Sequence, residues 1–305
     1  MRDVTVSVPP ARVPSDADGA RMCRRATDAM DATDAMREHF GTWQLDTLIA
    51  VGGLGEIWRS NRNEEIAAVK RLHTHLIRHP DALAQFAVEQ RLATGLPRHP
   101  NLVHAVEADA VDGRPYVALA LAPGEDLRRL LHPPPRPASA ARPDPAASVV
   151  LPRARVIAIA IAACDAAAHL HRHGFVHGDI NPGNLVVAID DHVTLVDLGV
   201  AREIGGGGAV RGTPAYMAPE QVRGERWTPA TDVFALGVVL WELVAGARLF
   251  HRGPPWLSMA AVVEAPAPPL GDPALDAIAQ AALAKDPAHR IAGAGELAQR
   301  LLAQR

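Results

Sequence analysis

The pattern of apolar and polar positions divides the chain into parts with different expected structures. Residues 1–39 show neither strict alternation nor a helical apolar stripe, and they repeat the string ATDAM, so we expect a flexible N-terminal arm. After this arm, short runs of β-type residues separated by turn residues predict a small antiparallel sheet. The expected strands are Trp43–Val51, Glu56–Arg59, Glu65–Leu72 and Arg114–Leu121.

Helical patterns interrupt this sheet once and then dominate the rest of the chain. A helix is predicted from Asp81, directly after Pro80, to about Gly95, with apolar residues along one face. Beyond Gly124 the pattern is mainly helical, with prolines at expected helix starts and glycines at expected helix ends. We therefore expect two lobes, a sheet-containing lobe over residues 40–123 and a mainly α-helical lobe over residues 124–305.

A proline-rich stretch over residues 132–149 interrupts the helical lobe. Its composition cannot pack a hydrophobic core, so we expect an insertion on the surface. The same stretch, or the N-terminal arm, could instead dock a partner, since proline-rich segments are recognised in extended form.

Composition narrows the class of protein. A chain of 305 residues with 48% hydrophobic and 21% charged residues is globular, and it can build two cored lobes. The net charge of −3, without a basic stripe, gives no indication of nucleic-acid binding. Cys23 and Cys164 are too few for a disulfide framework, and the apolar runs are too short for a membrane span or a signal peptide. We therefore expect a cytoplasmic protein that does not bind a membrane.

A glycine-rich turn lies between two expected strands. Gly52, Gly53 and Gly55 would let backbone amides approach phosphate oxygens that a Cβ atom would keep away. Ordinary hairpin chemistry also uses such turns, so the signal is weak alone. A dinucleotide-binding interpretation does not fit, because a strand and not a helix follows Gly55.

Lys70 ends an expected strand at the edge of the sheet that faces this turn. Its ammonium group could hold the phosphates of a nucleotide, and a carboxylate would be needed to fix its orientation. Glu89, on the helix predicted from Asp81, is the candidate. Taken singly, each residue is equally compatible with a solvated surface position.

The strongest chemical signal is HGDINPGN at 177–184, followed by LVDLG at 195–199. Asp179 could orient a hydroxyl group, and Asn184 and Asp197 offer oxygen ligands that suit Mg²⁺. With these residues the chain resembles the eukaryotic-like protein kinases, in particular their bacterial serine/threonine branch, from about Phe40 to the C terminus. GTPAYMAPE at 212–220 is similar to the end of a kinase activation segment, and TDVFALG at 231–237 is similar to the central helix of the large lobe.

The resemblance implies a bilobal, protein-kinase-like α+β fold and ATP-dependent transfer of the γ-phosphoryl group to Ser or Thr hydroxyls of protein substrates. Asp179 would orient the hydroxyl, with Thr213 and Asn181 beside it. Lys70, paired with Glu89, would hold the α and β phosphates, and Asn184 and Asp197 would bind Mg²⁺. ATP would be bound by Ala50, Val51, Gly52, Gly53, Gly55, Ile57, Ala68, Lys70, Leu119 as gatekeeper, Ala120, Ala122, Asp126 at the ribose, and Val186. The resemblance also pairs Glu220 with Arg290.

Four positions depart from the family pattern. Ala50 replaces the first glycine of the phosphate loop, and Leu198 replaces a phenylalanine. Gly178 replaces an arginine that receives a phosphate from the activation segment in the family, and residues 197–212 contain no Ser, Thr or Tyr. We therefore expect activity that needs no phosphorylation in this segment. Asn181 replaces a lysine that neutralises the transferred phosphoryl group, so we expect slow catalysis.

Two other interpretations remain open. HGD with PGN also resembles the catalytic loop of aminoglycoside and choline phosphotransferases, whose acceptors are small molecules, although the resemblance gives those enzymes no counterpart of GTPAYMAPE. The replacements at 178, 181 and 198 would also suit a pseudokinase that binds ATP as a scaffold. The sequence does not reveal the physiological substrate, the activating signal or the oligomeric state.

Overall fold

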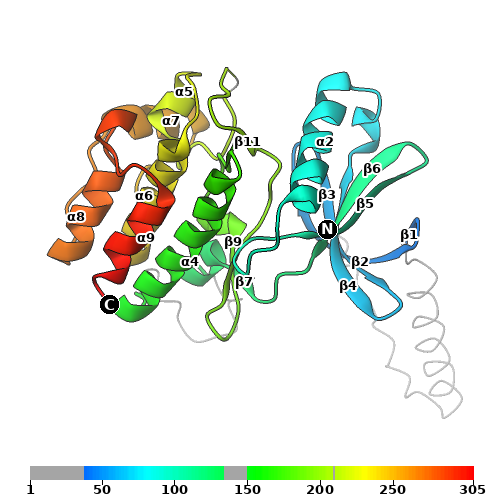
Figure 1. Cartoon of the computed structure of the whole chain (residues 1–305), viewed down its shortest axis with the longest axis horizontal. Coiled ribbons are helices and arrows are strands. Elements are labelled where there is room, and N and C mark those ends of the chain that lie inside the picture. Colours follow the sequence, from blue (N-terminus) through cyan, green and yellow to red (C-terminus); the bar gives the residue numbers. More distant parts are fainter. Residues whose placement is uncertain (1–37, 134–149, 209) are drawn as a thin grey trace, which may run out of the picture.

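The computed structural model describes residues 38–133, 150–208 and 210–305, which form a sheet-containing lobe and a mainly helical lobe (Figure 1). The expectations for the N-terminal arm before Glu38 and for most of the proline-rich stretch lie outside these described residues. The bilobal α+β architecture expected from the sequence is confirmed.

The first lobe, from here on the N-lobe, is a six-stranded antiparallel sheet with the order β1-β2-β3-β4-β6-β5. Trp43 and Val69 are fully buried in the small core on one face of this sheet. The strands are β1 (Glu38–Phe40), β2 (Trp43–Val51), β3 (Gly55–Arg62), β4 (Glu65–Leu72), β5 (Ala105–Val111) and β6 (Arg114–Ala120). The four strands predicted from alternation are thus confirmed, with shifts at their ends.

Two strands of this sheet escaped prediction. β1 pairs with β2 and begins at Glu38, before the start expected at residue 40. β5 has the sequence AVEADAV, and Ala, Glu and Asp have low β-propensity. β5 lies at the edge of the sheet and pairs only with β6, so tertiary pairing and not local propensity makes it a strand.

The helix predicted after Pro80 is confirmed as α2 (Pro80–Gly95). Pro80 occupies the first turn, where its missing N–H costs nothing, and Asp81 adds a favourable negative charge there. Phe86 and Leu92 are buried on one face of the helix. Glu89 is only 1% exposed, so a carboxylate is carried into the interior.

The second lobe, the C-lobe, is built around α4 (Arg153–Arg172) and α6 (Pro229–Ala245). The expected exits are confirmed, because Gly174 and Gly246 both have positive φ just after these helices. α4 is apolar enough over 18 residues to cross a membrane by composition, but 61% of that window is buried, as in a core helix. The other elements are α3 (Leu127–Leu131), α5 (Pro219–Val222), α7 (Pro255–Glu264), α8 (Pro273–Ala282), α9 (Ala294–Leu302), β7 (Glu125–Asp126), β8 (Phe175–Val176), β9 (Leu185–Val187), β10 (Val193–Leu195) and β11 (Arg202–Glu203).

The lobes are joined by backbone pairing as well as by the chain between β6 and β7. The amide of Leu195, in β10, donates to the carbonyl of Asn101 at 2.8 Å, and the amide of Val103 donates to the carbonyl of Leu195 at 3.0 Å. The segment between α2 and β5 therefore holds the end of β10. Asp197 follows two residues later, so this pairing helps to fix its position relative to the N-lobe.

Candidate active site

Three of the predicted polar residues meet between the lobes. The Lys70 Nζ atom, on β4, donates to Glu89 Oε1 and to Asp197 Oδ1, both at 2.6 Å. Glu89 comes from α2 and Asp197 from the loop after β10, so one ammonium group links the sheet, the helix and the C-lobe. The structure thus brings together the lysine and the two carboxylates that the sequence singled out.

The charges of this triad stabilise one another. Burial disfavours the ammonium form of Lys70, but the carboxylates of Asp197 and Glu89 more than offset this and raise its pKa. Burial alone would raise the pKa of Asp197, yet the contact with Lys70 holds it below the ordinary value. Lys70 is therefore positive and Asp197 negative at neutral pH.

Asp179 lies in the loop between β8 and β9 with its carboxylate held on both oxygens. Oδ1 accepts from the amide of Thr213 at 2.7 Å and from Asn181 Nδ2 at 3.2 Å, and Oδ2 accepts from Asn184 Nδ2 at 3.2 Å. Burial raises the pKa of this carboxyl group, and Thr213 and His177 oppose the shift. Thr213 contacts Asp179 through its backbone amide, and its side chain also lowers the pKa of that carboxyl group. The Thr213 hydroxyl accepts from Asn181 Nδ2 at 3.2 Å.

The sequence did not reveal what holds this loop in place. Asp232, on α6 and fully buried, accepts from the amides of His177 and Gly178 at 2.8 Å each and from His171 Nε2 at 2.9 Å. Burial would raise the pKa of this carboxyl group, but His171 and its other donors lower it, so it stays ionised. Asp232 lies in the motif TDVFALG, so this motif is the feature of the sequence from which its importance could have been predicted.

Asn184 and Asp197 fit a magnesium site by their donor chemistry. Asn184 donates its amide hydrogens to Asp179, which leaves Oδ1 as its acceptor. Asp197 Oδ1 contacts Lys70 and the amide of Gly199, whereas Oδ2 has no hydrogen bond among the described residues. The described residues contain no cluster of three or more His, Cys, Asp or Glu side chains suited to a metal. Two protein oxygens completed by phosphate and water oxygens are typical of Mg²⁺.

The register of the strands gathers the residues expected at the nucleotide base. Ile57 pairs with Lys70 across β3 and β4, Ala68 pairs with Leu119 across β4 and β6, and Asp126 pairs with Val186 across β7 and β9. The expected gatekeeper, Leu119, is buried. Ala120 donates its amide to His104, so its carbonyl and Ala122 are the groups left for a base.

Asp126 is already engaged at the position expected for the ribose. Its carboxylate accepts from the amide of Arg129 at 3.0 Å as the N-cap of α3, and it lies 3.3 Å from Arg129 Nε. Its first role in the structure is thus to start a helix.

In the glycine-rich turn, the reason for a glycine at position 55 is different from the expected approach of the backbone to phosphate. A Cβ atom at Gly55 would lie 2.2 Å from the carbonyl oxygen of Arg71, so glycine is required there by the close approach of β4. Gly53 has open space around it, and Ala50 and Val51 are exposed at the end of β2. The turn is closed by the amide of Gly52, which donates to the carbonyl of Gly55 at 2.8 Å.

A tryptophan explains the glycine of HGD. Gly178 has φ +75°, and a Cβ atom there would lie 2.2 Å from the ring of Trp227. Trp227 is fully buried, and the guanidinium of Arg202 stacks 3.7 Å above its ring. The aromatic ring thus occupies the space into which an arginine at 178 would extend.

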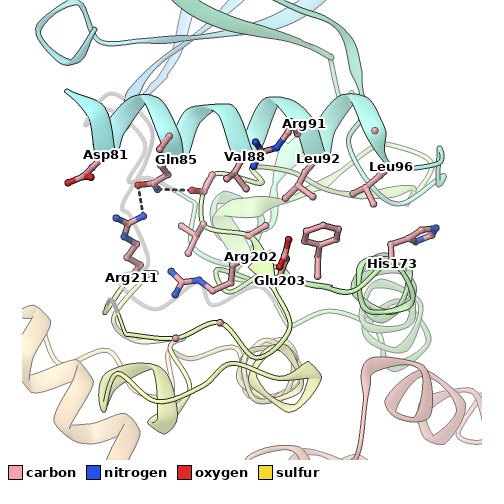
Figure 2. A pocket seen from close by; sticks show the side chains of 18 of the residues that line it. Asp81, Gln85, Val88, Arg91, Leu92, Leu96, His173, Arg202, Glu203 and Arg211 are labelled. Atoms are coloured by element: carbon pink, nitrogen blue, oxygen red, sulfur yellow. Dashed lines mark hydrogen bonds between the residues drawn. The ribbon is translucent and has the colours of Figure 1, made fainter. Parts of the chain in front are cut away.

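α2 is tied directly to the segment after Asp197. Gln85 Nε2 donates to the carbonyl of Gly199 at 2.8 Å, and Arg211 Nη1 donates to Gln85 Oε1 (Figure 2). The two bonds border a cavity of about 910 Å³ between α2 and this segment. Neither Gln85 nor Arg211 was expected from the sequence, because 126 residues separate them.

Asn181 contacts a cation from another element. Arg128 Nη2, on α3, donates to Asn181 Oδ1 at 2.8 Å. Asn181 also donates to Asp179, so Arg128 lies one side chain away from the predicted base.

The expected pair of Glu220 and Arg290 is confirmed. Two bonds of 2.7 Å join the guanidinium to both carboxylate oxygens, and both residues are buried. Thr231 donates to the same carboxylate at 3.0 Å, so the pair fixes the end of the 212–220 segment to α6. Its role is structural.

Comparison with known proteins gives the same assignment. The pattern that describes the protein kinase domain matches residues 43–300. The chain belongs to the protein kinase family. Two similar relatives are the serine/threonine-protein kinase PknB of Mycolicibacterium smegmatis, 32% identical over 84% of this chain and 41% of the relative, and the serine/threonine-protein kinase PknA of Mycobacterium tuberculosis, 32% identical over 87% of this chain and 62% of the relative. The chain therefore spans about two fifths to three fifths of the length of these two kinases.

Within the kinase family, the positions of Lys70, Glu89 and Asp197 have a specific meaning. Phosphoryl transfer requires the pair between the β-strand lysine and the helix glutamate and a correctly placed metal-binding aspartate at the same time. The structure contains the pair of Lys70 and Glu89, and the same Lys70 Nζ atom also contacts Asp197.

Proposed function

We propose that this chain transfers the γ-phosphoryl group of ATP to Ser or Thr hydroxyls of protein substrates. The observation that carries the proposal is the contact of Lys70 with Glu89 and Asp197, together with Asp179, which is close enough to Asp197 for the charge of Asp197 to act on its carboxyl group. The names of the relatives support a Ser/Thr acceptor.

In the proposed reaction each residue has a separate task. Lys70 holds the α and β phosphates, and Glu89 keeps its ammonium group in place. Asn184 and Asp197 would hold Mg²⁺, which supplies positive charge to the phosphate oxygens when bound. Asp179 accepts the proton of the acceptor hydroxyl while that oxygen bonds to the γ-phosphorus, and ADP leaves with the electrons of the broken P–O bond.

We further propose that no phosphate is needed in the activation segment. The ring of Trp227 fills the space beside Gly178, so no arginine is available there for a phosphate. Gln85, Arg211 and the carbonyl of Gly199 supply a link between α2 and the segment that contains no phosphate. We expect full activity from wild-type protein that carries no phosphate over residues 197–213, including at Thr213. Mass spectrometry of the assayed protein checks that these residues are unmodified.

We also propose that catalysis is slow because the catalytic loop, residues 177–184, carries no lysine or arginine. Asn181→Lys is expected to raise kcat by about 10²-fold, because one charged donor aimed at the transferred group contributes about that much. Asn181→Gln, which keeps the amide and adds only length, is the control. A lysine variant no faster than the wild type would contradict this interpretation of Asn181.

The experiment that tests the main proposal is an assay of the purified full chain with labelled ATP and Mg²⁺. Casein or a peptide library should be labelled, and Asp179→Ala and Lys70→Met should abolish the labelling. Labelling of aminoglycosides and not of proteins would instead indicate a small-molecule phosphotransferase. ATP binding without transfer to any acceptor would indicate a pseudokinase.

A further inference from the structure

A group of arginine and histidine side chains, from here on the basic cluster, adjoins the predicted base through Arg128, which contacts Asn181. It consists of Arg128 on α3, His132 at the end of α3, and Arg248, His251 and Arg252 in the loop between α6 and α7. Burial lowers the pKa of His132, and the positive charges of Arg248 and Arg128 lower it further. The same two arginines lower the pKa of His251 after burial does. The charges of Arg128, on α3, and of Arg248, in the loop after α6, therefore act on the same two histidines, and the lowered pKa values favour the neutral form of both histidines.

Among the described residues, no carboxylate forms an ion pair with Arg128, Arg248 or Arg252. Glu242 is the acid that both Arg128 and Arg248 act on, but it is 1% exposed. Its two oxygens already accept from the hydroxyl of Tyr216 at 2.7 Å and from the amide of Leu249 at 3.0 Å. Burial raises the pKa of Glu242, and its hydrogen bonds and the charges of Arg248 and Arg128 oppose that shift.

The arginines themselves are short of partners. Arg248 makes no hydrogen bond or ion pair with any of the described residues, and its Nε atom is buried. The Nε atom of Arg128 is buried and unpartnered as well. Arg129, the neighbour of Arg128, instead pairs with Asp126. A guanidinium group without an anionic partner can bind a carboxylate or phosphate group of a ligand. Charge-assisted hydrogen bonds of this kind are among the strongest in proteins.

The basic cluster adjoins the place where an acceptor must lie. Arg128 Nη2 is 2.8 Å from Asn181 Oδ1, and Asn181 Nδ2 is 3.2 Å from the Asp179 carboxylate. Tyr216 contacts Glu242, which also accepts from the amide of Leu249, the residue after Arg248. Tyr216 belongs to the 212–220 segment whose Thr213 amide holds Asp179. A peptide with its hydroxyl at Asp179 therefore has its neighbouring residues close to Arg128, and the 212–220 segment leads from there to the loop that carries Arg248.

We infer that the preferred acceptor is an acidic peptide, in which anionic side chains next to the Ser or Thr bind Arg128 and Arg248. The inference rests on the proposed kinase activity and names the class of its substrate. Anionic peptides gain two charge-assisted contacts and are attracted by the local positive field, whereas basic peptides meet repulsion.

The test uses Ser peptides that are identical except at the positions flanking the acceptor. One set carries Asp there, one Ala, one Lys and one phosphoserine, and kcat/KM is measured with the full chain at low and at high salt. We expect the Asp set to exceed the Ala set by about tenfold or more at low salt, the Lys set to be poorest, and the differences to shrink at high salt. If phosphoserine exceeds Asp, the inference holds with phosphate as the anion.

Variants then assign the preference to the basic cluster. Arg248→Met keeps most of the side-chain volume without the charge, and it should reduce the advantage of Asp over Ala while leaving the KM for ATP unchanged. Arg248→Lys should restore part of that advantage. Arg300→Met, at an exposed position of α9, is the control for the substitution and should change nothing.

The outcomes distinguish a failure of the proposed kinase activity from a failure of the inferred preference for acidic peptides. If no peptide is phosphorylated, the proposed function itself is wrong. If the peptides are phosphorylated and Asp, Ala and Lys sets react equally, or Lys is preferred, the kinase activity stands and the inference is overturned. The salt dependence of the wild-type protein decides the matter even if a variant at 248 does not fold.

Discussion

At the scale of single residues, Gly178 is determined by its backbone conformation and by the side chain packed against it. It has φ +75°, which strains any side chain, and the ring of Trp227 lies where a Cβ atom would be. The sequence shows that the arginine of the family is absent from position 178. Only the structure shows that the ring of Trp227, from another segment, occupies the space next to this position.

Gly178→Ala should therefore destabilise the fold strongly. The positive φ costs about 1–2 kcal/mol and the clash with Trp227 adds about 1–3 kcal/mol. Gly253→Ala is the matched control, because Gly253 has φ +79° and open space around it, so it pays only the first cost. Chemical denaturation of both variants measures the difference, and equal losses would contradict the role assigned to Trp227.

Asp179 sets the expected pH dependence. Its pKa is raised by burial, and it must be ionised to accept a proton, so kcat/KM should fall on the acid side with an apparent pKa above the ordinary aspartate value of about 3.9. The pKa of Lys70 is raised and that of Asp197 is lowered, so both keep their charges through this range. A pH–rate profile at saturating MgATP, with folding monitored in parallel, should place the acid limb above that value. An acid limb at or below it would show that burial does not govern Asp179.

At the scale of elements, the position of α2 decides whether Lys70 and Glu89 meet. Two links hold this helix against the C-lobe, the buried Lys70 triad and the bonds of Gln85 to Gly199 and Arg211 (Figure 2). Such a helix can shift as a unit, and contacts that favour one position change its population. Gln85 is thus expected to act on catalysis through the position of Glu89.

Gln85→Met should lower kcat by about tenfold, because it removes one neutral and one charge-assisted hydrogen bond while keeping the side-chain volume. The melting temperature should change little, since Gln85 is only half-buried. Gln299→Met, at an exposed position of α9, controls for the substitution itself. Unchanged kcat in Gln85→Met would show that the Lys70 triad alone positions α2.

The sequence predicted elements and contiguous motifs well, and long-range pairs poorly. α2 and the strands β2, β3 and β4 follow from periodicity and turn residues, whereas β5 needed its neighbour. Asp179 and Asn184 stand in one motif, so their roles could be predicted together. Arg128 reaches Asn181 across 53 residues of sequence, and nothing local in the chain indicates such a contact.

At the scale of the whole molecule, the proposed nucleotide site requires both lobes at once. Lys70 comes from the sheet and Asp197 from the C-lobe, and the carbonyl of Asn101 and the amide of Val103 hold the strand that precedes Asp197. A ligand that bridges the two lobes should therefore stabilise the whole fold and not one part of it. Any ligand that binds only the folded state adds stability that grows with its concentration.

MgATP at about 100 times its Kd should raise the melting temperature of the full chain by about 4 °C, because it adds about 2.7 kcal/mol to a protein of this size. Asp197→Ala should remove the Mg²⁺-dependent part of this shift, since it deletes the free carboxylate oxygen, and Lys70→Met should weaken the shift in ATP alone as well. Asp286→Ala, at an exposed carboxylate on the far C-terminal loop, should keep the full effect. If Mg²⁺ does not change the ATP-induced shift in melting temperature of the wild type, the assignment of Asn184 and Asp197 as a metal site is wrong. A magnesium-dependent shift without phosphoryl transfer would mean that the two lobes bind the nucleotide as a scaffold.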